Sequence, residues 1–163
     1  MKIEVRRGSL EDAGQISEVI NSVVEEGRFT SLKKHTAEEE KAFMQSLGDR
    51  EVIFIALVDG KVVGIQSLTE FAKWSDSMGH VGNILTLVRE DHRGKGVGKK
   101  LAEKTLQFAR DKGYKKISTY IIADNRMAVE YYKSLGFEVI GRWKDQVKIG
   151  QEFHDDLIVE LFL

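Results

Sequence analysis

Short apolar or alternating stretches recur along the chain, which is the pattern expected of β-strands. They predict strands at 3–7, 51–58, 62–71, 80–88, 116–123, 137–147 and 152–162. Asp59-Gly60 lies between two of these apolar runs, and this dipeptide predicts a two-residue hairpin turn. Ile149-Gly150 is expected to turn the final pair of strands.

Apolar residues that recur three and four positions apart predict four helices between these strands. The helices are expected at about 9–27, 36–48, 96–112 and 125–135. Ser9 with Asp12, and Thr36 with Glu39, have the capping-box spacing that begins a helix. The buried face of the second helix is expected to comprise Phe43, Met44 and Leu47.

The predicted order of elements is β α α β β β α β α β β. This order indicates the α/β (α+β) class, with a mixed, mostly antiparallel central sheet of about seven strands flanked by about four helices. Residues 80–123 form a strand–turn–helix–strand unit, which is expected to be a right-handed crossover between parallel strands.

Composition limits the classes of function. The chain has 163 residues, 42% hydrophobic and 31% charged, which indicates one globular domain over 1–163. A net charge of −1 provides no basic field for nucleic acid or an anionic membrane. The N-terminus lacks the apolar region of a signal peptide, and the apolar run at 52–58 is too short to span a bilayer. We therefore expect a cytoplasmic protein.

The absence of cysteine excludes a disulfide, a thiolate metal site and a cysteine nucleophile. An acyl transfer would have to be direct or use another nucleophile. His154, Asp155 and Asp156 are interpreted as the start of an edge strand, because no second histidine lies at ligand spacing. No metal site is expected.

The most informative segment is the glycine-rich turn at Arg93–Lys99, with the sequence RGKGVGK. It follows a strand and opens a helix, so several backbone N–H groups are free at the positive end of the helix. Glycine lets such amides approach an anion closely, and the lysines add positive charge. The turn therefore predicts a phosphate or pyrophosphate site, against the alternative of a glycine-rich loop that serves only packing.

Two common phosphate motifs do not fit this turn. The Walker A pattern fails because Arg93 stands where it needs glycine and Lys100 where it needs Ser or Thr. The dinucleotide fingerprint fails because the glycines of residues 94–98 are spaced GxGxG instead of GxGxxG. A nucleotide-binding module with a degenerate phosphate loop is accordingly disfavoured.

Arg93, Gly96 and Gly98 fill the fixed positions of the Q/R-x-x-G-x-G/A motif, and this turn resembles the acyl-CoA motif of the GNAT superfamily of N-acetyltransferases. Residues 125–137 resemble the N-x-x-A-x-x-x-Y-x-x-x-G-F block of the same family. Two motifs about 30 residues apart, on the expected elements, are more specific than either alone. The order of elements also matches the family over nearly the whole chain.

The resemblance implies the roles of individual residues. It implies acetyl-CoA as the cofactor, held by Thr86, Leu87, Val88, Arg93, Gly94, Lys95, Gly96, Val97, Gly98, Lys99 and Asn125. The strand end at 86–88 would pair with the pantetheine arm as an added strand does, and an N–H near Val88 would polarise the thioester carbonyl. Tyr132 matches the tyrosine that protonates the departing thiolate; its neighbour Tyr131 is the alternative, one of the two being expected in the core.

The catalytic base is where the chain departs from the family. Many members carry a glutamate five residues before the motif asparagine, and here that position is Tyr120. His80 is a candidate because its ordinary pKa is near ~6.5, with a backbone-bonded strand-end histidine as the alternative. The other candidates are Glu25, Glu26, Asp124 and a water chain.

The acceptor pocket is expected in the connection between the first two helices. In the family this connection lines the pocket, which implies Glu26, Phe29 and Thr30 as substrate-binding residues; the alternative is a solvated loop. The leading hypothesis is direct acetyl transfer to a primary amine of a small molecule or peptide. The second is an acyl-CoA-binding sensor without turnover. The partners implied are acetyl-CoA and an amine acceptor, and a homodimer is consistent with resembling proteins.

Overall fold

The computed structural model describes residues 1–163 and confirms the predicted order of elements. The strands are β1 (Glu4–Arg7), β2 (Val52–Val58), β3 (Lys61–Glu70), β4 (Val81–Val88), β5 (Lys116–Ile122), β6 (Glu138–Ile149) and β7 (Glu152–Phe162). The helices are α1 (Ala13–Glu25), α2 (Ala37–Gln45), α3 (Val97–Asp111) and α4 (Arg126–Ser134). No helix of the structure combines the length and the apolar character needed to cross a bilayer.

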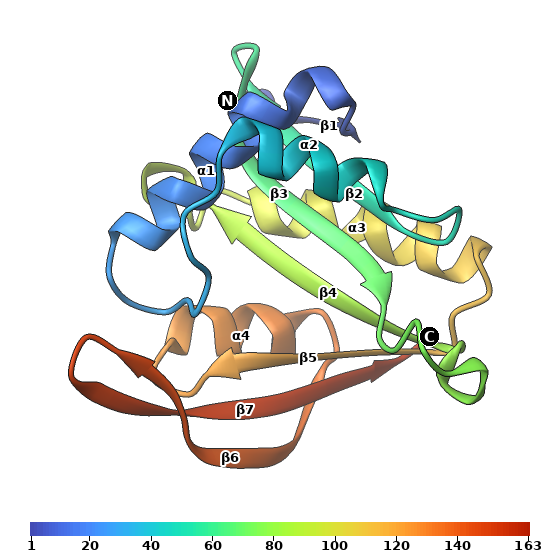
Figure 1. Ribbon diagram of the computed structural model, residues 1–163, viewed down its shortest axis with the longest axis vertical. Coiled ribbons are helices and arrows are strands. Elements are labelled where there is room, and N and C mark those ends of the chain that lie inside the picture. Colours follow the sequence, from blue (N-terminus) through green and yellow to red (C-terminus); the bar gives the residue numbers. More distant parts are fainter.

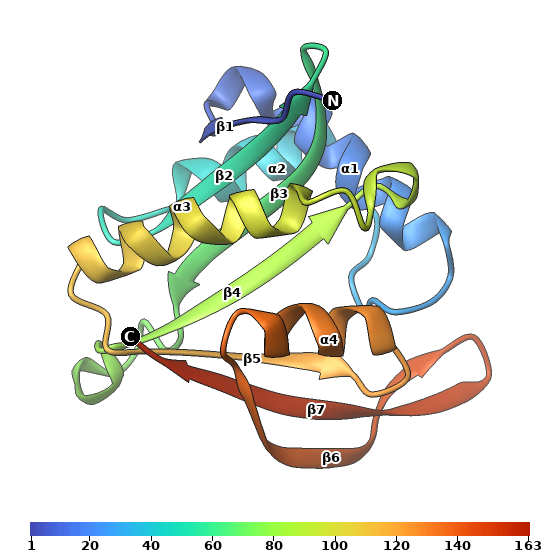
Figure 2. The same cartoon turned by 180° about the vertical axis from the view of Figure 1, so that it is seen from behind.

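The seven strands form one sheet in the order β1-β2-β3-β4-β5-β7-β6. Every neighbouring pair is antiparallel except β4–β5, which confirms the mixed, mostly antiparallel sheet. Helices α1 and α2 lie on one face of the sheet, where α1 packs on β3 and β4 (Figure 1), and α3 and α4 lie on the opposite face (Figure 2).

The parallel pair β4–β5 separates soon after it begins. Only three positions pair, from Val81 opposite Lys116 to Asn83 opposite Ser118. At the point of separation the Thr119 hydroxyl donates a hydrogen bond to the Ile84 carbonyl over 2.8 Å. Beyond it, β4 pairs only with β3, so the sheet is open along the second half of β4.

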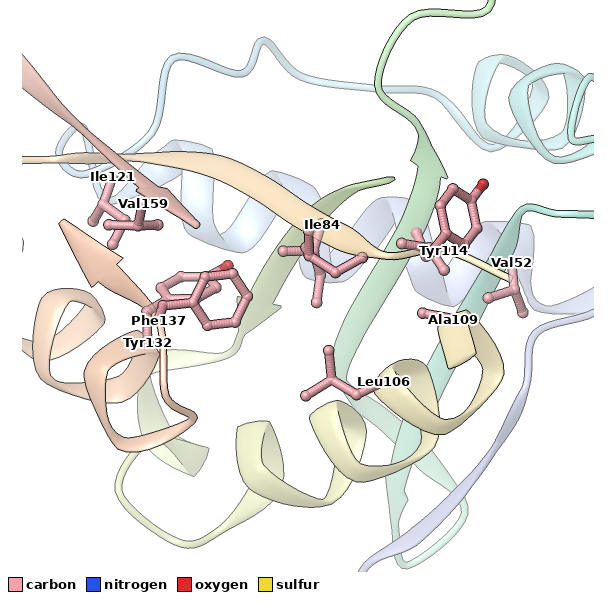
Figure 3. Close-up of a cluster of buried hydrophobic side chains, with 11 residues drawn as sticks. Val52, Ile84, Leu106, Ala109, Tyr114, Ile121, Tyr132, Phe137 and Val159 are labelled. Atoms are coloured by element: carbon pink, nitrogen blue, oxygen red, sulfur yellow. The ribbon is translucent and has the colours of Figure 1, made fainter. Parts of the chain in front are cut away.

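The hydrophobic core lies on both faces of the sheet. On one face, four apolar residues of α1 are buried: Ile16, Val19, Ile20 and Val23. On the other face, Tyr132 and Phe137 pack with Ile121, Val159 and Ile84 (Figure 3). The Tyr132 ring is therefore fixed by the core, with its ring centroid 5.2 Å from that of Phe137.

The hairpin turn and the second capping box have the local structure that the sequence predicts. Asp59 and Gly60 both have positive φ, 49° and 76°, as a type I′ hairpin turn requires. The Thr36 hydroxyl accepts from the Glu39 N–H over 3.1 Å, and the Glu39 carboxylate accepts from the Thr36 N–H over 2.8 Å, which confirms this capping box.

The buried face predicted for α2 is wrong in one residue. Phe43 is 40% exposed, whereas Glu40 is buried. Glu40 and Met44 lie at i and i+4 and so share the inner face, while Leu47 follows the end of α2 and packs with Met44 against the same core cluster. Phe43 precedes Met44 by one residue and is turned about 100° away from that face.

Candidate functional site

The glycine-rich turn presents a row of unpaired backbone N–H groups. Gly94 and Gly96 have φ of 70° and 85°, a left-handed conformation that favours glycine. The N–H groups of Gly94, Lys95 and Gly96 have no hydrogen-bond partner, and those of the first turn of α3 have none within the helix. A Cβ on Gly94 or Gly96 would have no atom within 4 Å, so the surface above these amides is open. The arrangement suits a diphosphate.

A cavity of about 710 Å³ lies where β4 and β5 have separated. Its lining contains most of the cofactor-binding residues expected from the sequence: Thr86, Leu87, Val88, Arg93, Gly94, Gly96, Val97, Gly98, Lys99 and Asn125. Lys95 is the exception, because its ammonium group donates to the Asp91 carbonyl over 2.7 Å, outside the cavity lining.

Tyr132 reaches the cavity from α4. Its hydroxyl lies 3.0 Å from the Thr86 hydroxyl, on the half of β4 that has lost its β5 partner. Tyr132 is almost wholly buried, and this burial raises the pKa of its phenol above the ordinary value near 10. The group therefore keeps its proton at neutral pH and can act as a donor.

Tyr131 and Gln66 form a hydrogen-bonded network with Thr86 and Tyr132. The Gln66 amide nitrogen donates to the Thr86 hydroxyl over 2.7 Å and to the Tyr131 hydroxyl over 3.1 Å. Tyr131 in turn donates to the Gly98 carbonyl over 2.9 Å. One connected set of polar groups thus joins the tyrosine pair to the glycine-rich turn.

Sequence reasoning missed this network. Tyr131 carried a signal, because it lies in the same sequence block as Tyr132. Gln66 gave a weaker signal, because it is a polar residue among the apolar residues Val62, Val63, Ile65 and Leu68 of β3. Its carbonyl oxygen is buried without a hydrogen-bond partner, which shows that the donors of its amide, and not its acceptor, are used.

Arg93 and Glu26 form an ion pair beside the turn. The Arg93 guanidinium donates to both carboxylate oxygens of Glu26, one of them over 2.8 Å, and its Nε donates to the Val88 carbonyl over 2.9 Å. Arg93 lowers the pKa of the Glu26 carboxyl. Both side chains are mostly buried, so the pair ties the turn to the end of α1 and leaves Glu26 a poor proton acceptor.

The α1–α2 connection closes one side of the cavity. Arg28 and Phe29 line it, and the Arg28 guanidinium lies 5.1 Å from the centre of the Phe29 ring. Arg28 also donates to Glu90, another lining residue, over 3.0 Å. Thr30 is not in the lining; its hydroxyl accepts from the Leu32 N–H.

Asn125 lies at the cavity, whereas His80 lies far from it. The Asn125 side-chain oxygen caps α4 by accepting from the Ala128 N–H over 3.1 Å, which leaves its NH₂ group unpaired at the cavity. His80 directly precedes β4, at the end where β4 and β5 are still paired, and its carbonyl accepts from Lys115 and Lys116. At about 3.3 Å per residue, it lies roughly 26 Å along the strand from Val88. The structure does not bring His80 to the cavity.

Known proteins share this sequence pattern and architecture. The family model described as Acetyltransferase (GNAT) family matches residues 18–137. An uncharacterized N-acetyltransferase of Methanocaldococcus jannaschii is 31% identical over 61% of this chain, a match that spans 46% of that protein. The L-amino acid N-acyltransferase MnaT of Escherichia coli is 28% identical over 65% of this chain and 69% of its own.

Solved structures extend the likeness to the whole fold. An acetyltransferase of the GNAT family from Streptococcus pneumoniae has a TM-score of 0.91 at 23% identity, over 99% of both chains. A proposed acetyltransferase of Salmonella typhimurium, solved with its cofactor acetyl-CoA, has a TM-score of 0.90 at 20% identity, over 99% of this chain and 94% of that one. With its glycine-rich turn, its separated central strands and a family match over most of its length, this chain belongs to the acetyltransferase (GNAT) family.

Proposed function

We propose that the protein transfers an acetyl group from acetyl-CoA directly to a primary amine of a small molecule or a peptide. The observation that carries the proposal is the position of the Tyr132 hydroxyl, buried beside Thr86 in the cavity that begins at the open amides of the glycine-rich turn. The relative MnaT, named for acylation of L-amino acids, favours a small acceptor such as an amino acid. Residues 1–163 would form a single N-acetyltransferase domain.

The turn would hold acetyl-CoA, which supplies the acetyl group as an activated thioester. The amides of Gly94–Lys99 would bind its diphosphate, since they are unpaired and open at a helix N-terminus. The unpaired NH₂ group of Asn125 and the free edge of β4 at 86–88 would contact its extended arm. The structural neighbour solved with acetyl-CoA supports this assignment.

Tyr132 would donate the proton that the departing thiolate needs. A tyrosine with an ordinary pKa near ~10 is a weaker acid than a thiol near ~8.5, so Tyr132 would act by donating a hydrogen bond to the sulfur while negative charge develops there. A proton that it passes to the sulfur would be replaced through the water that takes the proton from the amine. Burial keeps Tyr132 protonated until that charge develops. The Thr86 hydroxyl, 3.0 Å away, would orient the phenol.

A water chain is the base that we propose. Among the carboxylates named from the sequence, Glu26 pairs with Arg93, Glu25 with Lys34, and Asp124 with His154. His80 lies at the far end of β4. Removal of the amine proton through water leaves these ion pairs intact.

The homodimer and the cytoplasmic location stay predictions.

Two measurements test the function. Calorimetry with CoA should show binding, and a free-thiol assay with acetyl-CoA should show turnover with one class in a panel of amino acids, polyamines, aminoglycosides and short peptides. Binding without thiol release for any amine would favour the acyl-CoA sensor. Folded protein that binds no CoA would contradict both functions.

A further inference from the structure

The face of β5, β7 and β6 that turns away from α4 carries an exposed aromatic pair. Helices α1 and α2 lie on the β2–β4 side of the sheet and do not extend over these three strands (Figure 1). Tyr120 and Trp143 lie there with ring centroids 5.2 Å apart, and they are 47% and 40% exposed. Two aromatic side chains in contact are thus open to a ligand on this face.

Asp156 lies beside this pair, because it is directly opposite Trp143 on β6 and Ile122 on β5. Leu157 and Val159 of β7 stand opposite Ile121 and Thr119, on the face of α4, so Asp156 points to the other face by strand alternation. Asp156 as a whole residue is only 7% exposed, but its carboxylate oxygens are not fully sealed from solvent.

Asp156 differs from the neighbouring carboxylates because no side chain is paired with it. Asp155 pairs with Arg142 and Glu160 pairs with Lys116, both at 2.5 Å, and Asp124 lies 2.9 Å from a ring nitrogen of His154. Asp156 makes no ion pair and no side-chain hydrogen bond, and burial raises the pKa of its carboxyl. A buried carboxylate without a partner is unfavourable, and a cationic ligand would relieve it.

The unpaired carboxylate lies at the same end of the sheet as the cavity. Ile122, its partner on β5, accepts a hydrogen bond at its carbonyl from the N–H of Asn125, which lines the cavity. Val23 and Phe29 line the cavity from the side of α1, so the cavity reaches the face on which Asp156 lies. Asp156 and the aromatic pair are not part of the cavity lining and lie beyond it on this face.

We propose that Asp156, together with the Tyr120 and Trp143 rings, binds an ammonium group of the amine acceptor. The carboxylate supplies the opposite charge, and the two rings supply cation–π attraction. This inference rests on the proposed function and deepens it, because it makes the acceptor a cation when it binds. The ammonium is either the reacting amine before it loses its proton or a second ammonium group on the same molecule.

A binding experiment tests the subsite without turnover. Trp74→Phe leaves Trp143 as the sole tryptophan, since the chain has two. In that background, n-butylammonium chloride, titrated without acetyl-CoA, should change the Trp143 fluorescence with saturation, whereas n-butanol and sodium chloride should not. Asp156→Asn should weaken the affinity at least about tenfold. Glu152→Gln, an exposed residue of the same strand, is the matched control and should have no effect.

Two results would overturn the subsite. One is the absence of any saturable response in the folded Trp74→Phe protein, and the other is an Asp156→Asn variant that binds n-butylammonium as well as its parent. If Asp156→Asn does not fold, Tyr120→Leu replaces it, because that side chain is half exposed and its loss should also weaken binding. None of these results depends on acetyl transfer, so failure of the subsite is distinguishable from failure of the proposed function.

Kinetics then identify which ammonium is bound. With n-butylamine and 1,4-diaminobutane as acceptors in the free-thiol assay, Asp156→Asn should raise KM for both if the subsite holds the reacting amine. It should raise KM for 1,4-diaminobutane alone if the subsite holds a second ammonium. An unchanged KM for both acceptors, with turnover present, contradicts the assignment.

Discussion

The Tyr131 hydroxyl donates a hydrogen bond to the Gly98 carbonyl over 2.9 Å, and a Cβ built on Gly98 would lie 2.9 Å from the Tyr131 ring. The absence of a side chain at Gly98 therefore serves the packing of α4 against α3 as well as access to the backbone. This contact fixes the start of α3, and with it the amides of the turn, against the helix that carries Tyr132.

Gly98→Ala should weaken both stability and CoA binding. The new methyl group would displace the Tyr131 ring, and overpacking of this kind costs about 1–3 kcal/mol. Urea unfolding should show that loss, and calorimetry should show weaker CoA binding. Gly14→Ala is the control, because no atom lies within 4 Å of its Cβ and it should be neutral or stabilising. Equal stability of the Gly98 variant and the wild type would contradict the packing role.

Tyr132→Phe should lower kcat about 100-fold, the lower range for loss of a general acid. Binding of CoA should change little, because the ring that packs on Phe137 is retained. Tyr114→Phe is the control: its hydroxyl donates to the Arg50 carbonyl over 3.0 Å and does not line the cavity. Its loss should reduce stability by about 1 kcal/mol without changing kcat. Full turnover in Tyr132→Phe would remove the proton-donor role.

Gln66→Leu should lower kcat about tenfold, because small displacements of a positioned group reduce rates strongly. The change removes the donor to Thr86 and Tyr131, so both hydroxyls can reorient. The reduction should appear in kcat and not in the affinity for CoA, which separates positioning from a general loss of structure. Gln107→Leu, an exposed residue bonded to Asp111, is the control and should leave kcat unchanged.

Glu26→Gln should destabilise the protein by about 3 kcal/mol, since it removes one partner of a mostly buried pair. The side chains of Arg93 and Glu26 are 20% and 11% exposed. The adjacent Glu25→Gln is a close control, because its pair with Lys34 is largely exposed and should contribute less than about 1 kcal/mol. Equal urea midpoints for the two variants would show that burial does not distinguish the pairs.

Asp12 should make stability depend on pH in the acid range. Hydrogen bonds from Arg6, at 2.7 and 2.8 Å, lower the pKa of the buried Asp12 carboxyl in the folded state. Its contribution is therefore present above the unfolded pKa, near ~3.9, and is lost as the pH falls toward the folded value.

Asp12→Asn should cost about 2 kcal/mol at pH 6, and the difference from wild type should shrink below about pH 4. Urea unfolding of both proteins across this range gives the measurement. Glu11→Gln, which alters a neighbouring carboxylate without an ion pair, should follow the wild type at every pH. A difference that stays constant with pH would exclude the proposed ionic contribution.

The sequence predicted those parts of the site that are local in the chain. The amides of residues 94–99 and the cap at Asn125 depend on a strand–turn–helix order and on a helix start, and both can be recognised from neighbouring residues. The order of all eleven elements could likewise be predicted, because apolar periodicity marks the elements and a glycine follows each helix within three residues.

Contacts between distant segments could not be predicted in this way. Gln66 meets Tyr131 across 65 residues, and Arg93 meets Glu26 across 67, through the packing of separate elements.

His80 is a different case, since the chain direction alone places it at the start of a strand whose other end leads into the turn. A favourable ordinary pKa made it a candidate, although position argued against it.

The separation of β4 from β5 after three paired residues leaves an interruption inside the sheet, between two strands that both have other neighbours. The peptide groups along that interruption should exchange with solvent more readily than those of any central strand that is paired on both sides. A ligand bound there would slow this exchange. Binding could therefore be followed by the hydrogen exchange of individual amides, without a chromophore and without a reaction product.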